Sequence, residues 1–273
     1  MLDRHVLYQR DGAIATVTLD RPEVMNAMSE EVFQDLFDVV RIANDDARVR
    51  VVIVDGAGDN FCSGGDLSWE SGLDEHTAAK LMRLNSHLSF ELRHAPQPII
   101  GSVRGWCLGA GSELQLHFDA TIASDTATFG WPETRYGLLP FFYTPQLLPL
   151  VVGERAAREM LMFGRSYTAT QAVELGLVNM VVPDNELETE VRGWADELAA
   201  RDEGALRLVK LGLNGLGDIL RVAANHEAGI VSKAVGTPGY RENVEAFFSM
   251  AKGSRRPLAA PARVRASTNH APP

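Results

Sequence analysis

Two glutamates, Glu113 and Glu133, lie twenty residues apart, and each follows a segment that contains glycine. Glu113 comes after residues 109–112 (GAGS) and opens an amphipathic stretch, so its carboxylate is expected near a helix N-terminus. Glu133 follows Pro132, which restricts the local backbone. If the fold brings the two carboxylates together, they can share one water molecule and one substrate proton. This pair therefore indicates general acid and base chemistry.

Two glycine turns provide a second chemical feature. Gly64 and Gly65 follow the apolar run at residues 51–54 (VVIV), and Gly109 to Gly111 precede the stretch that carries Glu113. Glycine lets backbone N–H groups approach a ligand that a Cβ would block. Two such N–H groups can hold an oxyanion and stabilise charge that develops on a carbonyl oxygen. The turns are therefore candidates for binding the carbonyl of a thioester.

The elements that must position these residues alternate between strand and helix patterns. We expect strands at residues 13–19, 51–54, 98–103, 120–123 and 178–182. Helical patterns begin after Ser29, cover about 76–92, and start at the Thr168–Gln171 capping-box sequence. Beyond about residue 185 the chain is mainly helical, and its apolar residues need a partner surface. This succession predicts an α/β architecture.

Composition limits the function further. The 273 residues are 45% hydrophobic and carry 36 acidic against 26 basic side chains, a net charge of −10 that argues against nucleic acid as a partner. Two cysteines are too few for a zinc cluster or a disulfide scaffold, and the histidines lack metal-ligand spacing, so no metal is expected. No signal peptide or long apolar run is present, which predicts a cytoplasmic protein without a membrane segment.

The chain resembles the enoyl-CoA hydratase/isomerase, or crotonase, family over about residues 5 to 250. Five motifs in order carry this resemblance: LDRPE at 19–23 with Asn26 and Ala27, VVIVDGAGDNFCSGGDL at 51–67, PIIGSVRGWCLGAGSEL at 98–114, ATFGWPETRYGLLP at 127–140, and AVELGLV at 172–178. The resemblance implies a crotonase-like spiral of β-β-α units at residues 1–200. A helical segment at 201–256 for trimerisation and a disordered tail at 257–273 would follow.

The resemblance also assigns roles to residues. Glu113 and Glu133 match the two catalytic glutamate positions, and Gly65 and Ala110 match the oxyanion-hole amides. The acyl-CoA thioester would contact Glu23, Met25, Ala27, Ser63, Gly65, Asp66, Leu67, Ser68 and Gly109. Family members that only isomerise often keep just the second glutamate. Retention of both therefore predicts enoyl-CoA hydratase activity, with coenzyme A entering as part of the substrate and no permanently bound cofactor.

One segment departs from the family. After Pro140 the family continues with a small-residue turn beside the acyl chain, whereas this chain has Phe141, Phe142 and Tyr143. With Trp131, these side chains are expected to border the acyl pocket, where they either shape it for a bulky, cyclic or branched acyl group or face the core and carry no specificity. Two other functions stay open: a Δ3/Δ2 enoyl-CoA isomerase, and a non-catalytic scaffold that binds CoA thioesters. As a member of this family, the protein would form a homotrimer or a dimer of trimers.

Overall fold

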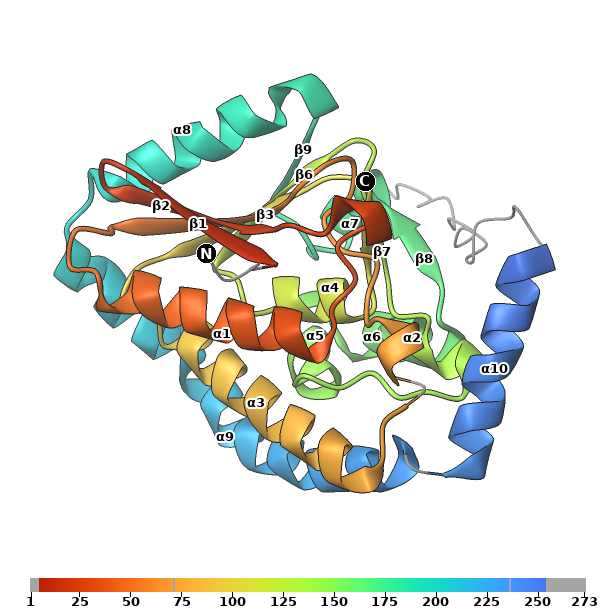
Figure 1. Ribbon diagram of the computed structural model, residues 1–273. Helices are drawn as coiled ribbons and strands as arrows, with labels where there is room; N and C mark the ends of the chain where they lie inside the picture. Colours follow the sequence, from red (N-terminus) through yellow and green to blue (C-terminus); the bar gives the residue numbers. More distant parts are fainter. Residues whose placement is uncertain (1–4, 71, 236, 254–273) are drawn as a thin grey trace, which may run out of the picture.

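The computed structural model describes residues 5–70, 72–235 and 237–253, and the predicted disordered tail at 257–273 lies outside these residues. Two β-sheets and the helices around them form the fold (Figure 1). The larger sheet has the strand order β1-β2-β3-β4-β6-β9 and the smaller one the order β5-β7-β8. The strands are β1 (Val6–Asp11), β2 (Ile14–Leu19), β3 (Val51–Gly56), β4 (Ile99–Val103), β5 (Trp106–Leu108), β6 (Ala120–Ser124), β7 (Thr128–Gly130), β8 (Ser166–Thr168) and β9 (Met180–Val182).

The helices lie on both sides of the larger sheet, with α8 on one face and α1, α3 and α9 on the other (Figure 1). They are α1 (Glu30–Asp45), α2 (Leu67–Glu70), α3 (Glu75–Arg93), α4 (Ala110–Gln115), α5 (Thr144–Val152), α6 (Glu154–Phe163), α7 (Ala169–Glu174), α8 (Leu187–Ala199), α9 (Glu203–Val235) and α10 (Pro238–Gly253). Short 3-10 turns at Pro22–Val24, Glu133–Tyr136 and Asp184–Glu186 complete the set. The predicted α/β class and the helical C-terminal region are both confirmed.

The larger sheet is parallel from β2 to β9, and only the hairpin of β1 with β2 is antiparallel. Parallel strands buried on both faces need continuous apolar side chains. Residues 51–54 meet this requirement, and all four are buried. The apolar side of α1, which includes Phe33 and Leu36, packs into the same core. The edge strand β1 was not predicted, because its sequence (VLYQRD) has only a weak alternation of apolar and polar residues.

The chain passes repeatedly from the larger sheet to the smaller one and then into a helix or helical turn. β4 leads to β5 and α4, and β6 leads to β7 and the turn that begins at Glu133. After β3, Cys62 forms a parallel bridge with Cys107 of β5, and α2 follows. These successive units agree with the β-β-α repeats that the family resemblance implies. The helix or helical turn of each unit begins at the same edge of the smaller sheet.

Helix termini follow local sequence signals. Thr168 and Gln171 form the predicted capping box of α7, and Gly176 ends that region with a φ of +73°. Ser29 stands at the N-cap of α1, but its hydroxyl donates to the Glu31 carboxylate and accepts no capping hydrogen bond from a backbone N–H of the helix. Among the described helices, none combines the length and apolar character needed to cross a membrane.

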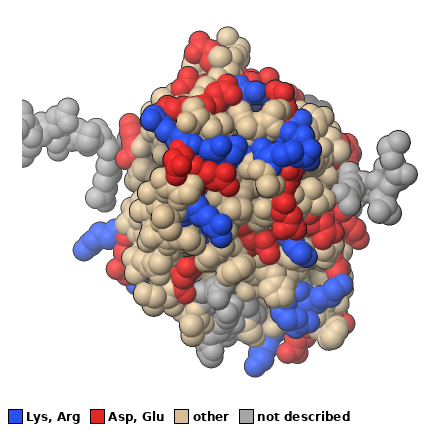
Figure 2. All heavy atoms as spheres, turned by 90° about the vertical axis from the view of Figure 1, so that its left-hand side faces the viewer, with Lys and Arg blue, Asp and Glu red and all other residues tan. Residues whose placement is uncertain are grey.

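Figure 2 shows basic and acidic side chains side by side over one face of the molecule. Ion pairs on the surface of the protein include Arg48 with Asp46 at 2.8 Å and Arg192 with Asp11 at 2.9 Å. Water and salt screen exposed pairs of this kind, so the stability of the fold rests on its buried apolar core. This face does not form the single-sign basic surface that a nucleic acid requires.

Candidate active site

Backbone pairing brings the two glycine turns together. Cys62 N–H donates to the Trp106 carbonyl and Leu108 N–H donates to the Cys62 carbonyl, at 2.8 and 2.9 Å. In the next unit, Gly109 N–H donates to Gly130 O at 2.9 Å. The segments that begin after Cys62, Leu108 and Gly130 therefore lie at one edge of the smaller sheet. Gly65, Ala110 and Glu133 belong to these segments.

The turns approach each other so closely that side chains are excluded. Gly64 has a φ of +112°, and a Cβ added there would lie 3.2 Å from the Leu108 carbonyl oxygen. Gly109 has a φ of +49°, and its Cβ would lie 2.9 Å from Oε1 of Glu133. Only glycine is compatible with both the backbone angle and the contact at these positions.

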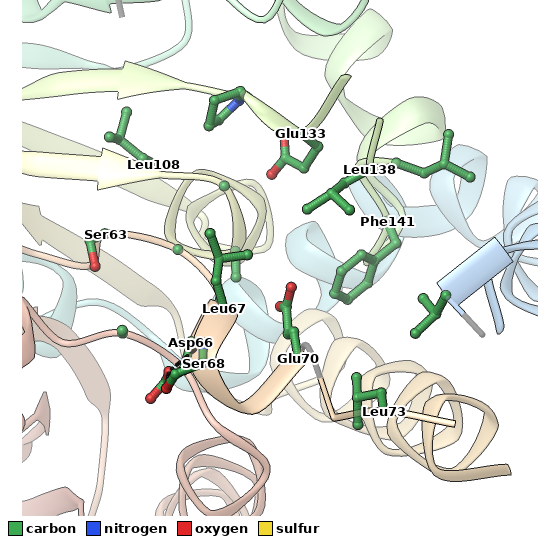
Figure 3. Close-up of a pocket in the computed structure, with 18 of the residues that line it drawn as sticks. Ser63, Asp66, Leu67, Ser68, Glu70, Leu73, Leu108, Glu133, Leu138 and Phe141 are labelled. Carbon is green, nitrogen blue, oxygen red and sulfur yellow. Dashed lines mark hydrogen bonds between the residues drawn. The ribbon is translucent and has the colours of Figure 1, made fainter. Parts of the chain in front are cut away.

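A cavity of about 460 Å³ opens where the turns meet, and Gly65, Ala110 and Glu133 lie in its wall. Figure 3 shows Glu133 pointing into the cavity, with Leu138 and Phe141 beside it. The predicted substrate contacts are all in the wall: Glu23, Met25, Ala27, Ser63, Gly65, Asp66, Leu67, Ser68 and Gly109. Of the predicted acyl-pocket residues, Phe141 lines the cavity.

Glu113 takes a different place. It is fully buried in α4 and is not among the described residues that line the cavity. Its Oε1 accepts a hydrogen bond of 2.6 Å from the backbone N–H of Phe141. The fold therefore puts Glu113 and Glu133 near the same turn but gives only Glu133 a place in the cavity wall.

The remaining aromatic residues pack into the core. Phe142 stacks on the His117 ring with centroids 4.3 Å apart, and Tyr143 meets the same ring edge-on at 6.4 Å. His117 is buried, and burial lowers its pKa to about 3, so the ring is neutral near pH 7. Trp131 is also fully buried. Because their side chains pack into the core, Trp131, Phe142 and Tyr143 do not line the cavity with Phe141.

The electrostatics of Glu133 suit an acid. Burial, followed by the negative charge of Glu70, raises the pKa of Glu133 to about 8, although a backbone hydrogen bond opposes the shift. Its Oε2 is buried without a hydrogen-bond partner. A carboxyl group in this setting is largely protonated near neutral pH and can donate its proton to a substrate atom in the cavity.

Sequence reasoning missed several wall residues. Glu70 of α2 and Tyr240 of α10 both line the cavity, as do Val231 and Val235 of α9. The side chains from α9 and α10 come from more than a hundred residues after Gly65 and Ala110 in the sequence. Glu70 lies five residues after Gly65, a spacing that places it at the end of a short helix, but no local pattern reveals that it turns back towards the glycine.

The two cysteines have no place in this chemistry. Cys62 and Cys107 are buried free thiols, and burial raises the pKa of Cys62 to about 12. Within the described part of the chain, no group of three or more His, Cys, Asp or Glu side chains is arranged to hold a metal ion. Carboxyl groups and backbone N–H groups of the cavity wall are available for chemistry.

Comparison with known proteins identifies a family for this chain. A model of the enoyl-CoA hydratase/isomerase family matches residues 9–249. The chain belongs to this family. The family and the predicted enoyl-CoA hydratase class of enzyme are thus confirmed.

Individual relatives cover nearly the whole chain. A protein of Syntrophomonas wolfei subsp. wolfei (strain DSM 2245B / Goettingen) named crotonyl-CoA hydratase is 30% identical over 256 residues, which cover 93% of this chain and 98% of that protein. An enoyl-CoA hydratase/isomerase structure from Xanthobacter autotrophicus Py2 is 32% identical, with a TM-score of 0.81 and coverage of 91% and 93%. Another from Pseudoalteromonas atlantica T6c is 27% identical, with a TM-score of 0.81 and coverage of 96% and 100%. The crotonase fold is confirmed.

Proposed function

We propose that this protein adds water reversibly, with syn geometry, to a 2-enoyl-CoA thioester to form the 3-hydroxyacyl-CoA. One observation carries the proposal: Glu133, with a raised pKa, lines the same cavity as the two glycine turns. The coarser activity, that of the enoyl-CoA hydratase/isomerase family, follows from the family match. A relative named crotonyl-CoA hydratase supports hydration as the specific reaction.

In this mechanism the backbone N–H groups of Gly65 and Ala110 bind the thioester oxygen. Water attacks the β-carbon, the double-bond electrons move towards the carbonyl, and the resulting enolate is stabilised by these two donors. Loss of one such donor typically reduces the rate by two to three orders of magnitude. The protonated Glu133 then delivers its proton to the α-carbon. A second carboxyl group must take the proton that the water loses, and we propose Glu113 for this role because it matches the family's first catalytic glutamate position.

The acyl chain would extend past Phe141 and Leu138, both of which line the cavity. Phe142 and Tyr143 pack around His117 and leave the cavity open. A non-catalytic scaffold with a closed pocket is therefore disfavoured. We propose that the Phe141 ring in the cavity wall selects the shape of the acyl group. Bulky, cyclic or branched enoyl groups are candidate substrates in addition to straight-chain ones.

A Δ3/Δ2 enoyl-CoA isomerase is the second candidate function. The observation that favours it is the position of Glu113, which does not share the cavity wall with Glu133. Moving a proton between two carbons of the substrate needs only one carboxyl group in the cavity. Hydration needs a second group to activate water. The two activities therefore make different demands on the same site.

The test is turnover by the purified protein. Crotonyl-CoA and a panel of branched, cyclic and aromatic 2-enoyl-CoA thioesters are supplied in parallel, and loss of the conjugated thioester absorbance is followed. A hydratase consumes these substrates and forms 3-hydroxyacyl-CoA, which mass spectrometry detects as a gain of one water. If the protein instead produces conjugated thioester from 3-enoyl-CoA and adds no water, the hydratase proposal is wrong.

A further inference from the structure

Glu70 brings a carboxyl group among the apolar side chains of the cavity, and the proposed mechanism does not use it. It is the last residue of α2 and lines the cavity. Figure 3 shows its side chain pointing into the space that Glu133 enters from the opposite side, with Leu138 and Phe141 nearby. A ligand that fills this space removes water from the carboxyl group, which is unfavourable unless another polar group replaces the water. The position of Glu70 therefore bears on which acyl groups the cavity accepts.

Two contacts fix the direction of the Glu70 carboxyl group. Its Oε1 lies against Gly65, and a Cβ added to Gly65 would overlap this oxygen. Its Oε2 accepts a hydrogen bond of 3.3 Å from the hydroxyl of Tyr240 on α10. Tyr240 is itself buried and lines the same cavity. The carboxyl group is therefore held at a defined place in the cavity wall by a residue from the far end of the chain.

This carboxyl group can accept more hydrogen bonds than the protein gives it. An ionised carboxyl group has two oxygens and accepts about four hydrogen bonds. Among the described residues, Tyr240 is the side chain that donates to Glu70. Burial raises the pKa of Glu70 to about 7, while the Tyr240 hydrogen bond opposes this shift and the charge of Asp66 adds to it. Near neutral pH a large share of the molecules therefore has an ionised Glu70 that can accept a hydrogen bond from a ligand.

The acyl chain of the substrate would pass this carboxyl group. In the proposed mechanism the thioester oxygen lies at the N–H groups of Gly65 and Ala110, and Glu133 serves the α-carbon. Oε1 of Glu70 is beside Gly65, and its side chain faces Glu133 across the cavity (Figure 3). The carbons beyond the β-carbon, which extend towards Phe141, are therefore the part of the substrate that would meet Glu70.

A hydroxyl group on these carbons suits the site. An apolar chain would displace water from Glu70 and leave its oxygens without the lost hydrogen bonds, whereas a hydroxyl would donate one in their place. A cationic group would also be attracted, but burying an ammonium beside a carboxylate removes two ions from water at high cost. A neutral hydroxyl is dehydrated more easily than an ion. Hydroxylated acyl groups therefore match this wall better than either alternative.

We propose that Glu70, held in place by Tyr240, is a specificity-determining residue that accepts a hydrogen bond from a hydroxyl group on the acyl chain beyond the β-carbon. The inference rests on the proposed hydration and leaves the roles of Glu113 and Glu133 unchanged. Phe141 then acts on the shape of the acyl group and Glu70 on its polarity. The substrate class is a 2-enoyl-CoA thioester whose acyl chain carries a hydroxyl group.

The test uses pairs of thioesters that are matched in size. 4-Hydroxy-2-butenoyl-CoA is compared with 2-pentenoyl-CoA, which has a methyl group in place of the hydroxyl. 4-Methoxy-2-butenoyl-CoA is compared with 2-hexenoyl-CoA, because the ether has an oxygen but no proton to donate. Loss of the conjugated thioester absorbance gives kcat/KM for each compound. The ratio within a pair is then compared between the parent protein and each variant, so that the intrinsic reactivity of the compounds cancels.

Glu70→Leu removes the acceptor and keeps a side chain of moderate size. We expect the hydroxyl-to-methyl ratio of kcat/KM to fall about 10- to 100-fold, the range for loss of a hydrogen bond to a charged group. Turnover of 2-pentenoyl-CoA should be retained or increased, because the apolar chain no longer removes water from a carboxyl group. Glu70→Gln keeps one neutral acceptor oxygen and should lower the ratio less than Glu70→Leu does.

Two further variants serve as controls. Glu70→Leu combined with Tyr240→Phe leaves no buried hydroxyl without a partner and should show the same lowered ratio with better stability in thermal unfolding. Glu242→Gln removes an exposed carboxyl group of α10, close in sequence to Tyr240, and should leave the ratios of both pairs unchanged. A purely structural role for Glu70 would reduce turnover of all four thioesters together and would not alter their ratios.

The possible failures are distinguishable. An unchanged hydroxyl-to-methyl ratio in Glu70→Leu and in the double variant overturns the role of Glu70, while hydration of 2-pentenoyl-CoA by the parent keeps the proposed function. A methoxy-to-propyl-chain ratio (4-methoxy-2-butenoyl-CoA against 2-hexenoyl-CoA) that falls as far as the hydroxyl-to-methyl ratio also overturns it, because the ether donates no hydrogen bond. If the parent protein hydrates none of the 2-enoyl-CoA thioesters, the proposed function and the role of Glu70 are both wrong.

Discussion

The backbone N–H of Phe141 donates a hydrogen bond of 2.6 Å to Oε1 of Glu113. Through this bond, the segment that departs most from the family motif is tied to the first of the two glutamates. Phe142 and Tyr143, which follow, adopt left-handed backbone angles with φ of 54° and 65°. Such angles cost of the order of 1–3 kcal/mol per residue, so the surrounding contacts must hold them.

Replacement of Glu113 by alanine should therefore destabilise the protein. The change leaves the Phe141 N–H without its acceptor and creates a void in a fully buried site. An orphaned buried donor costs about 1–3 kcal/mol, and Tm should fall by several degrees, at about 2–4 °C per kcal/mol for a chain of this size. Calorimetry checks this. Glu113→Gln, which keeps an acceptor oxygen, should stay closer to the parent Tm, and equal Tm values for the two variants would rule out this role.

Glu133→Gln should increase stability above neutral pH. A carboxyl whose pKa is about 8 in the folded state and 4.5 in the unfolded state binds more protons when folded, so its contribution to the unfolding free energy falls as pH rises from about 4.5 to 8. Glutamine does not titrate. The Tm difference between variant and parent should therefore grow between pH 5 and pH 8. Thermal denaturation of both proteins at the two pH values measures this difference. A constant difference would contradict the raised pKa.

Gly109→Ala should abolish most of the activity, because the new Cβ would meet Oε1 of Glu133 at 2.9 Å and displace the carboxyl group. Gly12→Ala is a matched control: Gly12 also has a positive φ, +58°, but its Cβ would meet nothing within 4 Å. Both changes put alanine at a positive φ, and the ψ of −122° at Gly109 lies outside the left-handed helical region, so the backbone strain is greater there. The activity of each variant is therefore compared per amount of folded protein, and a loss of kcat confined to Gly109→Ala would indicate displacement of Glu133. Comparable activity in the two variants would argue against the Glu133 contact.

The exposed apolar residues of α9 should form contacts between subunits. Leu208, Leu213, Ile219 and Val222 of this helix are all at least 71% exposed in the isolated chain. Exposed apolar patches of this kind mark association surfaces. We expect the protein to elute as a trimer or a dimer of trimers, and Leu213→Lys combined with Ile219→Lys to shift it to a smaller species. Light scattering after size-exclusion chromatography measures both masses. Ile42→Lys, on α1, is the control and should leave the mass unchanged; a monomeric parent protein would refute the prediction.

Local sequence signals were enough to predict most of the elements. The apolar run at 51–54 became β3, the pattern around 76–92 became α3, and the Thr168 to Gln171 signal became a capping box. Short strands such as β5 and β8 were not predicted, because three residues carry too little periodicity. These strands form only when segments that are far apart in the sequence come together and pair.

The family, the α/β class and the glycine turns can be read from the amino-acid sequence, because they depend on residue types and spacing along the chain. Which side chains share the cavity follows from the three-dimensional packing. Glu133 lines it, whereas Glu113 is held behind its wall by Phe141. Glu70 enters because Gly65 has no Cβ and because Tyr240, 170 residues later, reaches it. Such contacts depend on packing between segments far apart in sequence, which no local pattern encodes.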